Sequence, residues 1–192
     1  MIKSSPITPR IVADANVLFP ATLRDTLFRL QEEGIVEVRL SSRIWEEVTR
    51  NLVSTGRVTH ARALHLEQAA QAFFAIQGML VEGYEPLIST LTCDPKDRHV
   101  LAAAIQGHAA TIVTANLRDF PRASLAPFGI TAEHPDTFLL RLFVSHASEL
   151  VTLVQTQAAD KTRPPQTTEQ LLDALAVHVP TFVARVRATV QT

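Results

Sequence analysis

RIVADANVLFP, residues 10–20, runs a short apolar strand into a carboxylate, Asp14. Ile11, Val12 and Ala13 precede this carboxylate and further apolar residues follow it, so the segment is expected to enter the core. A buried charge is costly unless a partner offsets it. The partner could be a helix N-terminus, a basic side chain or a metal ion, and the other acidic segments of the chain have to distinguish among the three.

The composition is that of one globular domain with at most a small appendage. The chain has 192 residues, of which 46% are hydrophobic, and a net charge of -1. This balance gives no overall basic field for coating nucleic acid, but it allows a local basic rim around an acidic site. The single cysteine, Cys93, excludes an intramolecular disulfide framework and a cysteine-based zinc site.

Targeting signals are not evident in the sequence. The first ten residues, MIKSSPITPR, hold no apolar signal core, and no run reaches the roughly 18 apolar residues of a membrane span. We therefore expect a soluble cytoplasmic protein that does not associate with a membrane.

Strand-like and helix-like segments alternate along most of the chain, which predicts an α/β fold. Because helices separate the strands, the strands should pair in parallel through right-handed crossovers and form a three-layer α/β/α structure with a central parallel sheet. Sites in such sheets lie at the C-terminal ends of strands, where Asp14 and Thr114 are expected. Strands are predicted at 10–14, 36–40, 110–114 and 129–131, and the main helices at 21–33, 42–53, 59–74, 94–107 and 135–144.

The character of the sequence changes after His146. A linker-like segment, KTRPPQ (161–166), precedes Thr167 and Gln170, whose spacing is that of a capping box for a last helix. We predict a main domain at 8–145 and a helical C-terminal extension at 146–192 that serves packing or dimerisation.

Two adjacent glutamates in SSRIWEEVTRNL (41–52) are not equivalent. With Ser42 as the predicted N-cap, the apolar side chains of this helix form one buried stripe. Glu46 falls on the solvent side, where it can pair with Arg50 four residues on. Glu47 falls at the margin of the stripe and can point toward the sheet edge, so it is the better candidate for a functional group.

Two aspartates in CDPKDRHVLAAAI (93–105) also differ. Asp94 precedes a proline and is the natural N-cap of a helix. Asp97 lies within the apolar stripe of the first turn. The helix dipole accounts for an acidic residue in that turn, but it does not account for the inward direction, so a functional role stays open beside the structural one.

A third acidic segment, TIVTANLRDF (111–120), ends a strand at Thr114 and places Asn116 and Asp119 in the following loop. Polar clusters past strand ends are common sites, although an Asx-turn with a helix cap explains the same residues. Several carboxylates at one sheet edge repel one another, and divalent cations relieve that repulsion. Oxygen ligands suit Mg²⁺ or Mn²⁺, and such a site performs phosphoryl chemistry.

These segments resemble the PIN-domain family over about residues 10–145. The matching motifs, in chain order, are DANVL (14–18), SRIWEEV (42–48), DPKDRHVLAAA (94–104) and VTANLRDFP (113–121). GYEPL (83–87) and HPDTFLL (134–140) further resemble the branch of VapC-type toxins. Each motif alone is weak, but all of them in order are specific.

The resemblance implies that Asp14, Glu47, Asp97 and Asp119 form a metal-binding catalytic site. It makes Asn16, Thr114 and Asn116 auxiliary polar residues. Some relatives carry Asp where this chain has Asn116, which leaves open whether the site binds one metal ion or two. Basic residues near the motifs that could hold the RNA backbone are Arg43, Lys96, Arg98 and Arg118, with Arg50 and Arg122 close by.

The activity implied by the resemblance is that of a Mg²⁺- or Mn²⁺-dependent endoribonuclease. Water would attack a phosphodiester of a structured RNA, such as tRNA or rRNA, and leave 5′-phosphate and 3′-hydroxyl ends. The family also implies a homodimer and a cognate antitoxin protein that blocks the acidic groove.

Other functional classes fit less well. A HAD-type phosphatase needs a second Asp where Asn16 stands, and a Rossmann nucleotide binder needs a glycine-rich loop after the first strand. Two alternatives stay open: a PIN-fold RNA-binding or interaction module with little catalysis, and a housekeeping RNA-processing nuclease. The histidines are scattered and are interpreted as surface or satisfied core groups: His60, His65, His99, His108, His134, His146 and His178.

Overall fold

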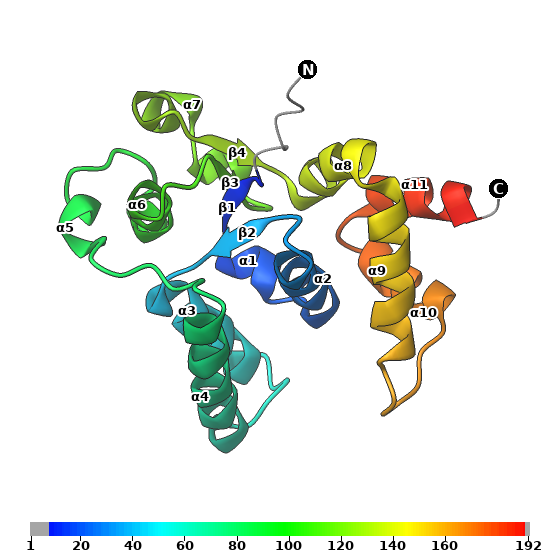
Figure 1. Ribbon diagram of the computed structural model, residues 1–192. Coiled ribbons are helices and arrows are strands. Elements are labelled where there is room, and N and C mark those ends of the chain that lie inside the picture. Colours follow the sequence, from blue (N-terminus) through cyan, green and yellow to red (C-terminus); the bar gives the residue numbers. More distant parts are fainter. Residues whose placement is uncertain (1–7, 191–192) are drawn as a thin grey trace.

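The strands that the structure describes form one parallel sheet. The computed structural model describes residues 8–190; most of the N-terminal stretch analysed above, residues 1–7, lies outside that range, as do residues 191–192. The strand order is β2-β1-β3-β4, and helices lie on both sides of the sheet (Figure 1), so the predicted three-layer α/β/α fold is confirmed. The strands are β1 (Arg10–Ala13), β2 (Glu37–Arg39), β3 (Thr111–Val113) and β4 (Thr131–Glu133).

The predicted main helices are present, although several of their bounds differ. α6 packs across β1 and β3 on one side of the sheet, and α2 packs against β2 on the other. The helices of the first part are α1 (Ala15–Leu18), α2 (Ala21–Glu32), α3 (Ser42–Ser54), α4 (His60–Ile76), α5 (Glu85–Ile88) and α6 (Arg98–Gln106). Those that follow are η1 (Leu117–Asp119), α7 (Arg122–Leu125), η2 (Ala126–Phe128), α8 (Pro135–Ser145), α9 (Ala147–Ala159), α10 (Thr168–Ala176) and α11 (Pro180–Val190).

Three predicted boundaries were wrong. The N-cap of α3 is Ser41, whose Oγ accepts from the Ile44 N–H at 3.3 Å, and not Ser42. α6 begins at Arg98 because residues 95–97 form a turn before it, so Asp94 is not its N-cap. β4 begins at Thr131, two residues later than predicted, because Gly129 takes a positive φ of 68° and ends η2 there.

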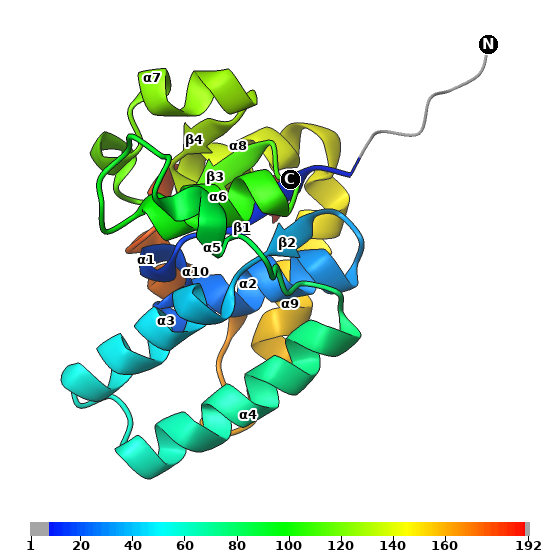
Figure 2. The same ribbon diagram turned by 90° about the vertical axis from the view of Figure 1, so that its left-hand side faces the viewer.

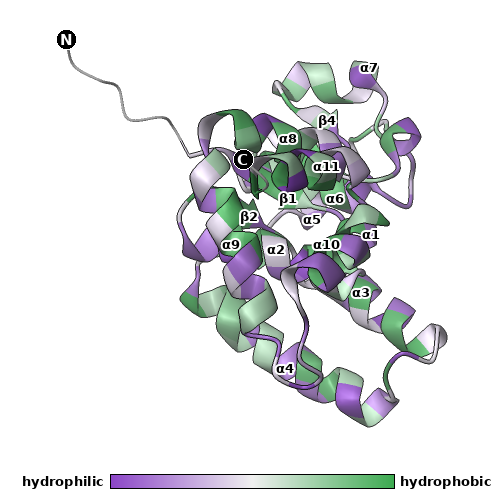
Figure 3. Ribbon diagram, turned by 90° about the vertical axis from the view of Figure 1, so that its right-hand side faces the viewer, coloured by the Kyte–Doolittle hydropathy of each residue, from purple (hydrophilic) through white to green (hydrophobic). Residues whose placement is uncertain are grey.

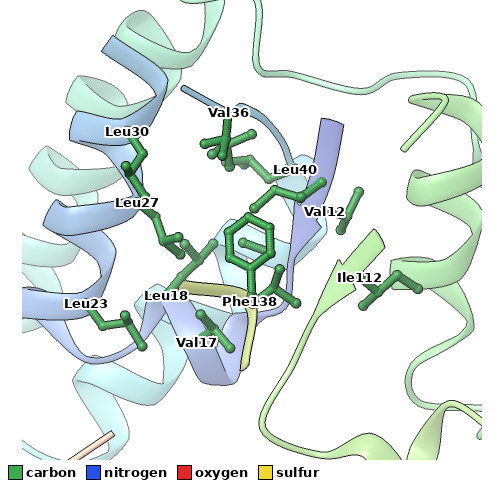
Figure 4. Close-up of a cluster of buried hydrophobic side chains, with 14 of the residues drawn as sticks. Val12, Val17, Leu18, Leu23, Leu27, Leu30, Val36, Leu40, Ile112 and Phe138 are labelled. Atoms are coloured by element: carbon green, nitrogen blue, oxygen red, sulfur yellow. The ribbon is translucent and has the colours of Figure 1, made fainter. Parts of the chain in front are cut away.

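The core joins the sheet to the helices of both halves of the chain. Figure 4 shows Leu23, Leu27 and Leu30 of α2 beside side chains of the β1–α1 segment and Phe138 of α8, all of them buried. Burial of this kind contributes about 1.5–3 kcal/mol for each large side chain. The α2 helix, which follows the first strand directly, is therefore fixed from the sheet side and from the C-terminal side.

The C-terminal helices pack on the main body through specific polar and aromatic contacts. Gln157 of α9 is fully buried against α2, and Phe143 of α8 lies edge-on to Phe182 of α11 with ring centroids 6.2 Å apart. The predicted capping box of Thr167 and Gln170 is present at α10. However, α10 is not the last helix, because α11 follows it. The division at residues 145 and 146 stays a prediction.

The helices carry both polar and apolar residues. Figure 3 shows hydrophilic and hydrophobic residues interleaved along α4 and α9. No single helix within residues 8–190 is long and apolar enough to cross a membrane; the pair α8 and α9 reaches that length and composition only together, and the two helices meet at 120°.

Candidate functional site

Asp14 stands at the end of β1 and begins α1. Its side chain is buried, with 4% of the residue exposed. One oxygen accepts from the Ala15 N–H at 2.6 Å, and the other accepts from Asn16 Nδ2 at 2.6 Å and Thr114 Oγ1 at 2.8 Å. Burial raises the pKa of Asp14; the bonds from Thr114 and Ala15 oppose the rise and the charge of Glu47 adds to it. Neutral donors alone therefore do not offset the charge.

The auxiliary residues predicted from the sequence build a polar network around Asp14. Asn16 Nδ2 also donates to Thr114 Oγ1 at 3.1 Å, and its Oδ1 accepts from the Ala115 N–H at 3.0 Å. Thr114 Oγ1 accepts from the Asn116 N–H at 3.0 Å. Asn116 takes part through its backbone; its exposed side chain forms no hydrogen bond within residues 8–190. Thus the ends of β1 and β3 are joined by side chains, with Asp14 at the centre.

Glu47 and Glu46 differ in burial as the helical periodicity predicts. Glu46 is exposed, whereas the Glu47 side chain is 22% exposed. The predicted pairing of Glu46 with Arg50 was wrong, because Arg50 Nη2 lies 3.7 Å from Glu47 Oε1 instead. Burial raises the pKa of Glu47, but His99, and then Arg50 and Arg43, lower it by more, so the net shift is downward. Glu47 is therefore ionised at neutral pH.

His99 of α6 is a site residue that the sequence analysis missed. Its side chain is fully buried, its Nδ1 lies 2.8 Å from the Lys96 carbonyl oxygen, and its Nε2 lies 3.4 Å from Glu47 Oε1. That distance falls short of a well-formed hydrogen bond, and Nε2 has no other partner in the described part of the chain. The sequence left open whether His99 is a surface residue or a satisfied core group; it is a core residue, but its Nε2 is not satisfied. The sequence held no signal for the partner, because Glu47 belongs to a distant helix.

Asp97 occupies the N-cap position of α6 without capping it. Its side chain makes no capping hydrogen bond and is half-buried. Burial, followed by the charges of Asp14, Asp119 and Asp94, raises the pKa of Asp97 to about 6. Asp97 therefore shares an electrostatic field with carboxylates from two other segments. The inward direction predicted from the apolar stripe agrees with this coupling.

Asp119 and Asp94 lie on neighbouring loops but have different surroundings. Asp119 ends η1 and is half-buried, with Arg118 Nε 3.4 Å from its Oδ1. Asp94 is exposed, and its Oδ1 accepts from the Lys96 N–H at 2.9 Å. The Asp94 N–H donates to the Asp119 carbonyl oxygen at 3.3 Å, which ties the loops together. Asp94 thus has a structural task, but not the predicted one of capping α6.

The donor set fits a hard divalent cation. The charge of Glu47 acts on Asp14, and the charges of Asp14 and Asp119 act on Asp97, so pairwise electrostatic effects link these four carboxylates. Oxygen ligands of this kind suit Mg²⁺ or Mn²⁺. Within residues 8–190, no three His, Cys, Asp or Glu side chains are placed to hold one ion together. The fit therefore rests on the chemistry of the donors and on the mutual repulsion that raises the pKa of Asp97.

The basic residues predicted to contact RNA do not share one role. Arg43, Lys96 and Arg118 are exposed near the acidic groups. Arg98 is half-buried and its Nε donates to the Cys93 carbonyl oxygen at 3.3 Å, so its side chain is partly engaged within the protein.

Comparisons with known proteins agree with the fold. The PIN domain family matches residues 10–118, and the VapC50 C-terminal domain family matches residues 135–188. A Mycobacterium tuberculosis (strain H37Rv) protein named "Putative ribonuclease VapC50" is 42% identical over 105 residues, which are 55% of this chain and 62% of the relative. The match thus spans less than two thirds of that relative. No solved structure matches. Since the PIN domain family matches more than half of the sequence, and the structure has a central parallel sheet, the chain belongs to the PIN-domain family.

Proposed function

We propose that this protein is a divalent-metal-dependent endoribonuclease of the VapC type, the toxin of a toxin–antitoxin pair. The observation that carries the proposal is the pKa of Asp97, which burial and then the charges of Asp14 and Asp119 raise to about 6. Carboxylates that repel one another at a strand end are an arrangement that a bound cation stabilises. The name of the Mycobacterium tuberculosis relative supports a ribonuclease.

The four acidic residues share the task of binding the metal ion in this proposal. Asp14, Asp97, Asp119 and Glu47 would hold Mg²⁺ or Mn²⁺. Such an ion, when bound, polarises the phosphodiester, lowers the pKa of water and stabilises the leaving oxygen. Asp14 is oriented by the first N–H of α1 and by Thr114. The pKa of Glu47 is lowered by His99, Arg50 and Arg43 in spite of its burial, so Glu47 is ionised and would accept a hydrogen bond from the attacking water.

The proposed substrate is structured RNA such as tRNA or rRNA. Arg43, Lys96 and Arg118 are exposed around the acidic groups and would contact phosphates outside the reacting one. Attack of water on the phosphodiester would leave 5′-phosphate and 3′-hydroxyl ends. A cognate antitoxin, a homodimer and a cytoplasmic location complete the proposal, and the two matched VapC50-related regions support the VapC assignment.

A cleavage assay on a pool of tRNA and rRNA tests the activity. Wild-type protein is incubated with Mg²⁺, with Mn²⁺ or with EDTA, beside Asp14→Asn. The expected result is cleavage with either metal and none with EDTA or in the variant. RNA binding without cleavage under any metal would contradict the nuclease proposal and favour an interaction module. Growth arrest on expression, relieved by the product of a neighbouring gene, distinguishes a toxin from a housekeeping nuclease.

A further inference from the structure

Arg24 of α2 is a half-buried cation without an acidic partner. No carboxylate within residues 8–190 forms an ion pair with it, and Asp25 acts on it only through its charge. Its Nη1 donates to the Leu18 carbonyl oxygen at 2.6 Å and to that of Phe19 at 3.4 Å. Burial lowers the pKa of Arg24, so the protein keeps this charge at a cost. Its contacts show what the charge is used for.

The two carbonyls that Arg24 binds belong to the C-terminal end of α1. The last carbonyls of a helix lack partners within the helix, and a cation there also complements the helix dipole. α1 has only four residues, too few to be stable alone. Its other end is capped by Asp14, and Asn16 lies within it. Arg24 therefore satisfies carbonyl groups at the C-terminal end of the short helix that has Asp14 as its N-cap and contains Asn16.

Arg24 also contacts the helix that carries Glu47. Its guanidinium lies over the ring of Trp45 of α3, 5.7 Å from the ring centroid. Trp45 is buried and stands two residues before Glu47. α1 packs against both α2 and α3, and Figure 2 shows the three helices close together in the middle of the view, between α7 and α4. One side chain thus touches the elements that supply Asp14 and Glu47.

We infer that Arg24 is a positioning residue for the acidic site: it holds α1 against α3 and so fixes Asp14 and Asn16 relative to Glu47. The inference rests on the proposed function, because the positioned groups are its metal ligands. Arg24 itself contacts neither the RNA nor the ion. Removing it should loosen α1 and weaken metal binding even in protein that remains folded.

The test compares Arg24→Met, Arg24→Lys and a matched control, Thr26→Val, with the wild type. Methionine keeps length and packing on Trp45 but cannot donate, whereas lysine restores one cationic donor. Thr26 lies on the same helix and bonds to Gln157 of α9, on the side away from α1, so its loss destabilises without touching the site. The readouts are Mn²⁺ affinity by calorimetry, amide hydrogen exchange at residues 15–19, melting temperature and RNA cleavage.

Arg24→Met is expected to bind Mn²⁺ about tenfold more weakly, the scale seen when a residue that orients metal ligands is lost. Exchange at residues 15–19 should accelerate, Arg24→Lys should recover part of both losses, and Thr26→Val should only melt earlier. Unchanged Mn²⁺ affinity and exchange in Arg24→Met would overturn the inference. If the wild type neither binds Mn²⁺ nor cleaves RNA, the proposed function fails, and the exchange data alone then decide whether Arg24 holds α1.

Discussion

The raised pKa of Asp97 lowers the stability of the metal-free protein at neutral pH. This pKa is raised from 3.8 to about 6, chiefly by burial and then by the charge of Asp14. The native state therefore holds the proton more tightly than the unfolded state, and stability is lost as pH rises from the ordinary pKa to the raised one. Asp97 is partly exposed, so solvent screening reduces the effect to about 1 kcal/mol.

Asp97→Asn should therefore raise the melting temperature of metal-free protein at neutral pH by about 2–4 °C. Near pH 4, where the wild-type carboxyl already holds its proton for much of the time, the difference should largely vanish. Thermal unfolding in EDTA at both pH values measures this. A variant that melts below the wild type at neutral pH would show that Asp97 is not under repulsion.

The neighbouring glutamates of α3 provide a matched pair. Glu47→Gln should lower cleavage about a hundredfold, because it removes an ionised carboxylate whose charge acts on Asp14. Glu46→Gln should keep wild-type activity, since Glu46 is exposed on the outer side of the same helix. Single-turnover cleavage rates with saturating metal compare the two. Equal losses would contradict the assignment of Glu47.

Single residues were predictable where a local pattern governs them. Periodicity separated Glu47 from Glu46, because burial repeats along a helix. Asp97 stands in the turn before α6, where helical periodicity does not apply. His99 and Arg24 were not recognised as parts of the site. Their partners, Glu47 and the end of α1, are brought near by the fold, and a single sequence does not encode such contacts in its local pattern.

At the scale of elements, one buried amide side chain forms hydrogen bonds between α2 and α9. Gln157 Oε1 accepts from Thr26 Oγ1 at 2.9 Å, and its Nε2 donates to the Thr22 carbonyl oxygen at 3.0 Å. Thr26→Val leaves the buried oxygen without its donor, which should cost about 1–3 kcal/mol. Thr156→Val, on the exposed side of α9, should change stability by less than about 0.5 kcal/mol. Urea unfolding compares them; equal midpoints would contradict the account.

Helices with local capping signals could be predicted from the sequence. Helices and strands whose ends depend on long-range contacts could not. The helix at 167–176 was found from its own capping box. α11 was missed because its first N–H groups are capped from another helix: Asp136 of α8 accepts from the Thr181 and Phe182 N–H groups at 3.1 and 2.8 Å. β4 begins later than predicted because Gly129 adopts a turn conformation, which the apolar pattern of the sequence does not reveal.

At the scale of the whole molecule, the C-terminal extension is part of the core rather than an attachment. Leu153 and Val154 of α9 are buried, and α9 also pairs with α2 through Asp160 and Arg29 at 2.8 Å. A chain ending at Ser145 would expose this apolar surface of α2. We expect it to be insoluble or to bind a hydrophobic dye strongly. A soluble truncated chain with an unchanged melting temperature would contradict this description.

The central claim is that carboxylates of this sheet edge hold the ion that RNA cleavage requires. The most direct measurement is the Mn²⁺ dependence of cleavage for wild type, Asp97→Asn and Asp94→Asn. Asp94 is the matched control: its exposed side chain accepts from the Lys96 N–H, which asparagine also does, and its charge raises the pKa of Asp97 less than those of Asp14 and Asp119 do. The account predicts metal-dependent cleavage in the wild type and Asp94→Asn and none in Asp97→Asn. Wild-type cleavage in Asp97→Asn, or cleavage that persists in EDTA, would contradict it.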